Sequence, residues 1–143
     1  MSQRSLTPSC PCGLPRPYPD CCGRYHAGAA APDAESLMRA RYTAFTLGLR
    51  DYLLATWHPD TRPPELDFDG PAPKWLGLKV IAHRPLDDSH AEVEFVARFK
   101  IAGRAIRQHE RSRFEKIMGR WYYLDGTPPE AAPAQDGPNL TPP

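Results

Sequence analysis

The sequence predicts an α+β fold in which two helices pack on a curved antiparallel sheet. Hydrophobic residues recur at helical spacing in the segment after Asp33, and from Trp75 onward they alternate with polar residues as in strands. Helices that precede several strands in the sequence are typical of this class, because the helices then cover one face of the sheet. A chain of 143 residues can bury one core of this kind.

Two helices are expected before residue 59. Asp33 is a candidate N-cap for the first helix, and Gly48 is expected to end it, because glycine readily adopts the left-handed conformation found at helix C-termini. One face of this helix is predicted to carry Leu37, Ala40, Arg41, Ala44, Phe45 and Gly48. A shorter second helix is predicted over residues 50–57, since Pro59 disfavours helical conformation in the residue before it.

Four strands are expected after a proline-rich connection. Their predicted ranges are 75–82, 91–100, 104–117 and 120–124, with turns at Gly103 and at Met118-Gly119. One face of the longest strand carries Ile106, Gln108, Glu110, Ser112 and Phe114. The other face carries Arg107, His109, Arg111, Arg113 and Glu115, and it is expected to meet solvent because almost all of it is charged.

Polar side chains on the inward faces indicate a possible site. Burying a polar group without a partner costs about 1–3 kcal/mol, so we hypothesise that Arg41 points inward and pairs with Glu110. The functional interpretation is a small-ligand pocket, with His58 as an acid or base near physiological pH. The candidate pocket residues are Arg41, Tyr42, Trp57, His58, Gln108, Glu110 and Trp121. The favoured alternative is a structural ion pair that fixes the helix against the sheet, and no catalytic residue is assigned.

All four cysteines lie close together in the sequence, at Cys10, Cys12, Cys21 and Cys22. This spacing favours one tetrahedral zinc site, and four thiolates leave no open coordination position, so the zinc is expected to be structural. Disulfides are an alternative, although bonds within either doublet would be strained and crossed pairing needs an oxidising compartment. Free thiols are another, although such a cluster would be prone to oxidation. The N-terminus lacks the apolar core of a signal peptide, so a cytoplasmic location is expected.

Two sets of motifs resemble known families. Cys10-Pro11-Cys12-Gly13 and Tyr18-Pro19-Asp20-Cys21-Cys22-Gly23 resemble the SEC-C motif, a zinc module known from the C-terminal tail of the preprotein translocase ATPase SecA. Leu14-Pro15 stands where that motif usually has Ser-Gly. The chain is also similar to the YchJ-like family of small bacterial proteins, through Tyr25–Gly28, Leu37–Phe45, Tyr52–Pro59, His109–Phe114 and Gly119–Gly126.

The resemblance covers about residues 10 to 126 and implies both a fold and a metal. The implied fold is a roll like that of nuclear transport factor two, also called cystatin-like, after a zinc module that binds through its four cysteines. It implies no established reaction. We expect a flexible N-terminus over residues 1–9, the zinc module over 10–26, the roll over 27–126 and a disordered proline-rich tail over 127–143.

Two classes of function follow from these predictions. The favoured one is an interaction or adaptor protein whose zinc module docks on a protein or ribosomal partner. The alternative is a ligand-binding or enzymatic roll with a pocket around Arg41, His58 and Glu110. A sealed interior around Arg41 and Glu110 would favour the first, and an open pocket faced by His58 would favour the second.

Composition argues against two further partners. No apolar run is long enough to span a bilayer, and a net charge of +1 provides no strong field for nucleic acid. A basic strand face raises the possibility of phosphate contacts on ribosomal RNA. It consists of Arg104, Arg107, Arg111 and Arg113, with His109. The neighbouring Glu115 and the low net charge favour an ordinary solvated face instead.

Overall fold

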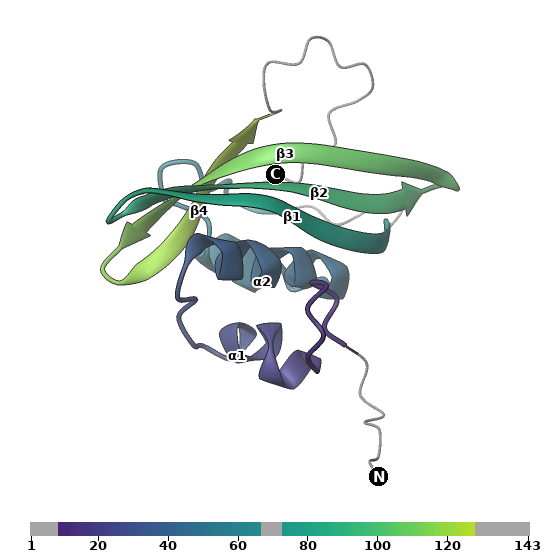
Figure 1. Ribbon diagram of the computed structural model, residues 1–143, viewed down its shortest axis with the longest axis horizontal. Coiled ribbons are helices and arrows are strands. Elements are labelled where there is room, and N and C mark those ends of the chain that lie inside the picture. The colour runs from purple at the N-terminus through teal and green to yellow at the C-terminus, as the bar shows by residue number, and fades with distance from the viewer. Residues whose placement is uncertain (1–8, 67–72, 128–143) are drawn as a thin grey trace.

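A four-stranded antiparallel sheet and the helices on one of its faces make up the computed structural model, which describes residues 9–66 and 73–127 (Figure 1). The strands are hydrogen-bonded in chain order: β1 (Lys74–Asp87), β2 (His90–Ile101), β3 (Arg104–Ile117) and β4 (Arg120–Thr127). The predicted α+β class is confirmed. The proposed flexible N-terminus and proline-rich tail lie outside the described residues, except for Ser9 and Thr127.

The helices form two layers beneath the sheet. Helix α2 (Ala34–Leu47) lies against the sheet and is followed by the short α3 (Arg50–Ala55). A 3-10 turn, η1 (Tyr18–Asp20), leads into α1 (Cys22–His26), which lies on the side of α2 that faces away from the sheet (Figure 1). Helix α2 therefore lies between most of the cysteine segment and the sheet, and Gly13 approaches β1 directly, where a Cβ atom on it would lie 3.3 Å from Leu78 O. Within the described residues, no helix has the length and hydrophobicity that crossing a bilayer requires.

The ends of α2 are those predicted from the sequence. The carboxylate of Asp33 accepts a hydrogen bond from the Ser36 N–H at 2.8 Å, as an N-cap does. Gly48 ends the helix in the left-handed conformation, with φ 73°. Helix α3 ends two residues before the predicted residue 57, because the chain beyond it pairs with β4. There the Tyr123 N–H donates to Thr56 O at 2.8 Å, and the His58 N–H donates to Tyr123 O at 2.7 Å.

The first and last strands run further than predicted. Strand β1 continues past Ala82, through Pro85, to Asp87. It can do so because it is an edge strand with register shifts at Val80/Ala82 and Pro85/Asp87, and proline is tolerated at such positions. Strand β4 continues past Leu124 to Thr127 alongside β3. Strand β3 has the predicted bounds.

The core lies between α2 and the inner face of the sheet. Its fully buried members include Leu37 from α2, Val93 from β2 and Phe114 from β3. The inner face of β3 also buries the polar residues Gln108, Glu110 and Ser112, as the alternation predicted. Three polar side chains, one of them a carboxylate, thus lie in a row on the inner face of β3.

Candidate functional site

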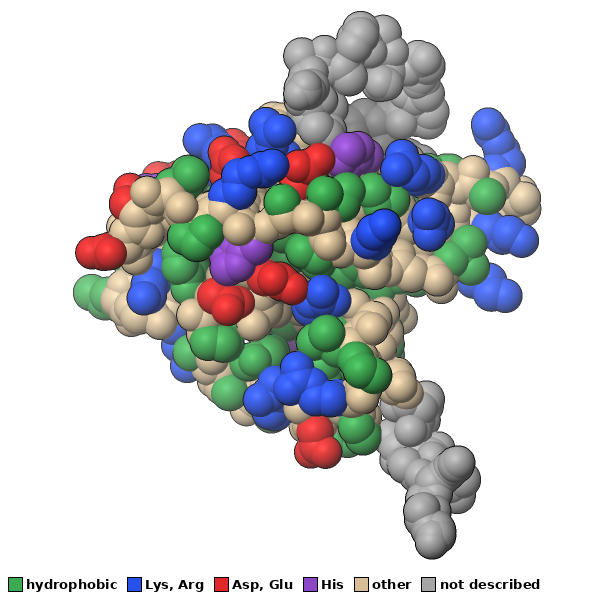
Figure 2. All heavy atoms as spheres, in the orientation of Figure 1, with side chains coloured by type: hydrophobic (Ala, Val, Ile, Leu, Met, Phe, Trp, Pro, Cys, Tyr) green, Lys and Arg blue, Asp and Glu red, His purple; other side chains and the backbone are tan. Residues whose placement is uncertain are grey.

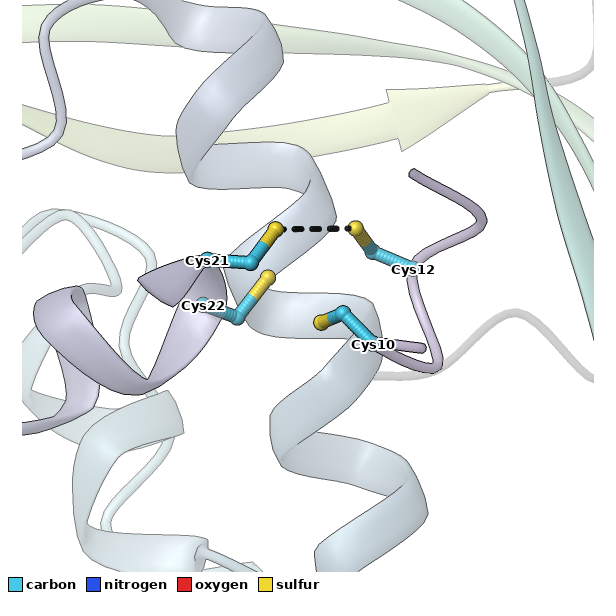
Figure 3. A group of neighbouring side chains, drawn as sticks. All are labelled: Cys10, Cys12, Cys21 and Cys22. Carbon is cyan, nitrogen blue, oxygen red and sulfur yellow. Dashed lines mark hydrogen bonds between the residues drawn. The ribbon is translucent and has the colours of Figure 1, made fainter. Parts of the chain in front are cut away.

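The four cysteine side chains converge on one point (Figure 3). All are buried, and their sulfur atoms lie within 4.8 Å of one another. The Cys12 and Cys21 sulfurs are 3.7 Å apart. Four sulfurs bound to one zinc at ~2.3 Å would be about 3.8 Å apart in a tetrahedron, so the arrangement fits a tetrahedral metal ion. All four are free thiols, so the disulfide alternative is not what the structure contains.

Local backbone structure brings the two doublets together. The Cys10 N–H donates to Arg16 O at 2.7 Å, and the Gly13 N–H donates to Cys10 O at 3.2 Å. Gly13 closes this turn at φ 100°, a backbone conformation that residues other than glycine rarely adopt. Cys21 precedes α1 and Cys22 is its first residue. A tight turn therefore supplies one pair of thiols and a helix N-terminus the other.

Burial and neighbouring thiols shift the pKa values of Cys12, Cys21 and Cys22 in different directions. A hydrogen bond from the Cys22 thiol lowers the pKa of Cys12 to about 5. Burial raises the pKa of Cys21 to about 11, and the hydrogen bond to Cys12 together with burial raises the pKa of Cys22. Metal binding requires thiolates, so a bound cation would replace protons on Cys21 and Cys22.

Helix α2 forms one wall of the cysteine cluster. The fully buried Thr43 donates its hydroxyl to the Cys22 sulfur at 3.4 Å and lies 3.8 Å from the Cys10 sulfur. The Arg39 guanidinium donates to Cys12 O at 2.8 Å. Such outer contacts orient metal ligands and tune their basicity. The sequence offered no signal for Thr43, because a polar residue within a helix is ordinarily solvent-exposed.

His26 lies near the cysteine cluster, but both of its ring nitrogens form hydrogen bonds to other residues. Its Nδ1 is 2.6 Å from the Tyr18 hydroxyl and its Nε2 is 2.9 Å from Ala40 O. Both ring nitrogens are therefore occupied. In residues 9–66 and 73–127, the four cysteines form the one group of potential metal ligands close enough to share an ion.

A second candidate site is a small cavity between α2 and the sheet. Its volume is about 30 Å³, and a single water needs about 10–15 Å³, so it has room for about two waters. Four of the predicted pocket residues, Arg41, Tyr42, Gln108 and Glu110, line it. The remaining lining residues are Met38, Phe45, Trp75, Phe95, Ala97, Ser112 and Tyr123.

Arg41 and Glu110 both point inward, as hypothesised, whereas the direct pairing between them stays a prediction. Arg41 Nη1 donates to Leu53 O and to the Thr56 hydroxyl, each at 2.8 Å. Its guanidinium also lies over the rings of Trp57 and Tyr123. Burial lowers the pKa of Arg41 to about 10, and the negative charge of Glu110 partly opposes that shift. Arg41 thus ties α2 to the C-terminal end of α3 and to β4, which is a structural role.

Glu110 is held by its neighbours on β3. Its carboxylate accepts hydrogen bonds from Gln108 Nε2 and from the Ser112 hydroxyl, each at 2.8 Å. Gly126 on β4 lies directly against the same carboxylate, because a Cβ atom at this position would overlap it. The Gln108 Oε1 atom is buried and has no hydrogen-bond partner within the described residues. A water in the cavity would satisfy it.

The other three predicted pocket residues do not line the cavity. Trp57 packs edge-to-face against Tyr123. His58 Nε2 lies 2.7 Å from Glu115 Oε1, and its Nδ1 accepts a hydrogen bond from the Asp60 N–H at 3.0 Å. The His58 ring therefore links the chain after α3 to β3, and it does not face Arg41 and Glu110. Trp121 lies in a different depression.

That depression is a groove of about 240 Å³ between the cysteine segment and the roll. One side is formed by α1 and the loop after it, and the other by α3 and the start of β4. Arg120 Nη2 donates to Gly28 O at 3.1 Å across it. The indole N–H of Trp121 is buried without an acceptor among the described residues. The groove is lined by Tyr25, His26, Gly28, Ala29, Ala30, Ala31, Leu37, Tyr52, Ala55, Thr56, Arg120, Trp121 and Tyr122.

Sequence comparison identifies the family of this chain. Residues 33–126 match a family model described as the middle, NTF2-like domain of YchJ. A UPF0225 protein of Bordetella parapertussis is 64% identical over 121 residues, covering 82% of this chain and 91% of that protein. A UPF0225 protein of Xanthomonas campestris is 54% identical over 127 residues, covering 87% of this chain and 98% of that protein.

Two solved structures share the fold. The solution structure of a SEC-C motif containing protein from Rhodopseudomonas palustris has a TM-score of 0.75 and 35% identity, covering 84% of this chain and 98% of that one. The crystal structure of a SEC-C motif containing protein from Psychrobacter arcticus has a TM-score of 0.69 and 34% identity, covering 90% and 85%. The chain belongs to the YchJ-like (UPF0225) family, and its roll is NTF2-like.

Proposed function

We propose that this protein is a small interaction module in which a structural zinc ion holds a docking surface for a segment of a partner protein. The observation that carries the proposal is the set of four buried cysteine sulfurs, which lie within 4.8 Å of one another and are seated on α2. The likeness to two SEC-C motif proteins supports the same view of the cysteine segment.

Zinc is the metal that best fits this ligand set. Soft thiolates in a tetrahedral arrangement favour zinc, which needs no redox partner and has no geometric preference of its own. Four protein ligands complete its coordination and leave no position for substrate. The ion would supply the positive charge that keeps Cys21 and Cys22 deprotonated, and so would hold the turn and α1 together.

The groove beside the cysteine segment is the proposed docking surface. Its aromatic lining, from Tyr25, Tyr52 and Trp121, provides apolar contact area. Aromatic side chains with a polar tip are enriched at protein interfaces. The buried indole N–H of Trp121 would gain an acceptor from a partner's backbone carbonyl after a small side-chain shift. These features suit an extended peptide with small apolar side chains, presented by a free protein or by a ribosomal protein.

The enzymatic alternative receives less support. The cavity at Arg41 and Glu110 has room for about two waters, and His58 is not among its lining residues. The hydrogen bonds of Arg41 fasten α3 and thus account for its burial without any chemistry.

Partner capture with two matched arginine variants tests the proposal. Ala30→Arg places a long cationic side chain in the groove from an exposed loop position, and Leu47→Arg adds the same charge at an exposed site on α2 outside the groove. We expect partners captured by the zinc-loaded protein to be retained by Leu47→Arg and lost with Ala30→Arg and with the zinc-free protein. Direct titration of the identified partner should repeat this order. Retention by Ala30→Arg would contradict docking in the groove, and a metal analysis without zinc would contradict the metal assignment.

A further inference from the structure

We propose that one end of the outer face of the sheet binds the phosphate backbone of a double-stranded nucleic acid. This surface, called the basic end below, consists of five exposed side chains: Lys74, Lys79, Arg98, Lys100 and Arg107. They come from β1, β2 and β3, near the turn that joins β2 to β3. Figure 2 shows Lys and Arg side chains gathered at this end of the molecule. Arg104 in the adjoining turn adds a further exposed cation.

Like charges face each other across the strands at the basic end. Lys74 is the register partner of Lys100, and Arg98 is the register partner of Arg107. Like charges directly opposite one another destabilise a sheet. The segments that carry them, residues 74–80, 96–101 and 104–108, contain no Asp or Glu. Among the residues the structure describes, none of the five cations forms a salt bridge, whereas an anion placed over them would relieve the repulsion.

The opposite end of the same face is arranged differently. Arg84 lies 3.3 Å from Glu94, and Arg113 lies 2.6 Å from Asp125. His109 lies 2.7 Å from the same Glu94. The net charge of +1 therefore conceals a separation of charge along the strands. The basic end also differs from the basic face of one strand that the sequence suggested. Arg113 of that face forms a salt bridge, and the cations of the basic end come from three strands.

The layout of the basic end favours a repeating anion over a single one. Outward residues two apart on a strand are about 7 Å from each other, and neighbouring strands are about 4.8 Å apart. The five cations thus spread across three strands, over a wider area than one small anion would cover. A nucleic-acid backbone offers a matching row of phosphates, and arginine binds phosphate through two parallel hydrogen bonds.

We infer a duplex and not a single strand because the segments of the basic end place no aromatic ring on this surface. Single strands are held by aromatic rings on which bases stack. The aromatic residues of these segments, Trp75 and Phe99, face the core, where their ring centroids are 4.9 Å apart. Contacts would therefore be made to the backbone, with little preference for base sequence.

This inference does not depend on the proposed function. The groove and the cysteine cluster lie on the helical side of the sheet, whereas the basic end lies on the face that α2 does not cover (Figure 1). A peptide and a duplex could bind at the same time.

Fluorescence anisotropy with labelled duplex RNA and duplex DNA of 20 base pairs tests the proposal, using the full chain loaded with zinc. We expect micromolar binding at low salt, and five phosphate contacts give a slope of log K against log salt of about −4.5. Arg98→Gln/Arg107→Gln should weaken binding at least tenfold and reduce the slope by about 1.8. Arg84→Gln/Arg113→Gln removes the same charge from paired positions on the same face, and it should change binding less than twofold.

Arg107→Glu separates loss of binding from loss of folding. It places an acid opposite Arg98, so binding should be lost while the thermal midpoint is unchanged or raised. A lower thermal midpoint for Arg107→Glu would contradict the view that Arg98 and Arg107 repel each other. Equal losses in the two double variants would show an effect of net charge alone. Tighter binding to single strands, to polyglutamate or to vesicles containing phosphatidylserine would overturn the assignment to duplex nucleic acid.

Discussion

At the scale of single residues, Thr43 is where the roll contacts the cysteine cluster. It lies on α2, yet its hydroxyl donates to the Cys22 sulfur. We predict that Thr43→Val weakens zinc binding about tenfold, because outer contacts of this kind contribute 10–100-fold to metal affinity. Competition with a chromogenic chelator measures the change. Thr43→Ser keeps the hydroxyl and should bind nearly as tightly as wild type, whereas equal loss in both variants would point to packing instead.

Gly126 determines where the carboxylate of Glu110 can lie. A methyl group at this position would overlap the carboxylate and displace it from Gln108 and Ser112. We predict that Gly126→Ala lowers the free energy of unfolding by about 2 kcal/mol, since a buried polar group would lose its partners. Urea unfolding measures this cost. In a Glu110→Ala background the same change should cost much less, and an undiminished cost would assign the effect to the β4 backbone.

At the scale of elements, the sequence was most informative where a local rule was sufficient. Asp33 and Gly48 mark the ends of α2 because capping depends on neighbouring residues alone. The length of β1 depends on its place at the sheet edge, which tolerates Pro85, and the sequence does not state that place. The end of α3 likewise depends on β4, which pairs with Thr56 and His58 from a distant part of the chain.

The junction of α1 with α2 should be sensitive to acid through His26. Ala40 O can only accept, so Nε2 carries the hydrogen, and Nδ1 accepts from the Tyr18 hydroxyl. The Tyr52 ring packs edge-on against the same imidazole. Burial lowers the pKa of His26, so the folded protein binds the proton less readily than the unfolded chain, whose histidines titrate near ~6.5. The stabilising contribution is therefore present above that pH and is lost as pH falls below it.

Urea unfolding between pH 7.5 and pH 5 measures this contribution. Cys12, whose pKa is about 5, also binds protons in this range, so the relevant quantity is the difference between wild type and His26→Gln. Glutamine keeps a donor for Ala40 O but does not titrate. Wild type should lose more stability over this range than the variant. Equal losses would show that His26 is not responsible.

At the scale of the whole molecule, the candidate sites differ in how far the sequence could predict them. The four cysteines are adjacent in the chain, so their spacing alone indicated a shared ion. Arg41 and Glu110 were found through polar residues at inward positions, a pattern that helix and strand periodicity reveals. His58 and Trp121 were predicted to line the same pocket, but they lie elsewhere. Their positions depend on the path of the chain after α3 and on the β3–β4 turn, which the sequence pattern does not reveal.

The structure also links the predicted module and roll through α2. The chain segment before α2 buries the four cysteines against Ala40, and Thr43 and Arg39 bind them from the same helix. The sheet, by contrast, packs on the opposite side of α2, through Met38 and Tyr42. Removal of the metal should therefore affect α2 from one side only.

Hydrogen exchange before and after chelation tests this organisation. A segment of about fifteen residues is too short to bury its own core, and structural zinc contributes about 10–16 kcal/mol of binding free energy in comparable peptides. We predict that chelation removes amide protection from residues 10–24 while β2 and β3 stay protected, because their core does not include the cysteines. The middle of α2 around Ala40 should show intermediate loss, since only one of its faces loses contacts. Collapse of protection in β2 and β3 would show that the cysteine segment is an integral part of the roll's core, and unchanged protection of residues 10–24 would show that the fold of this segment does not require metal.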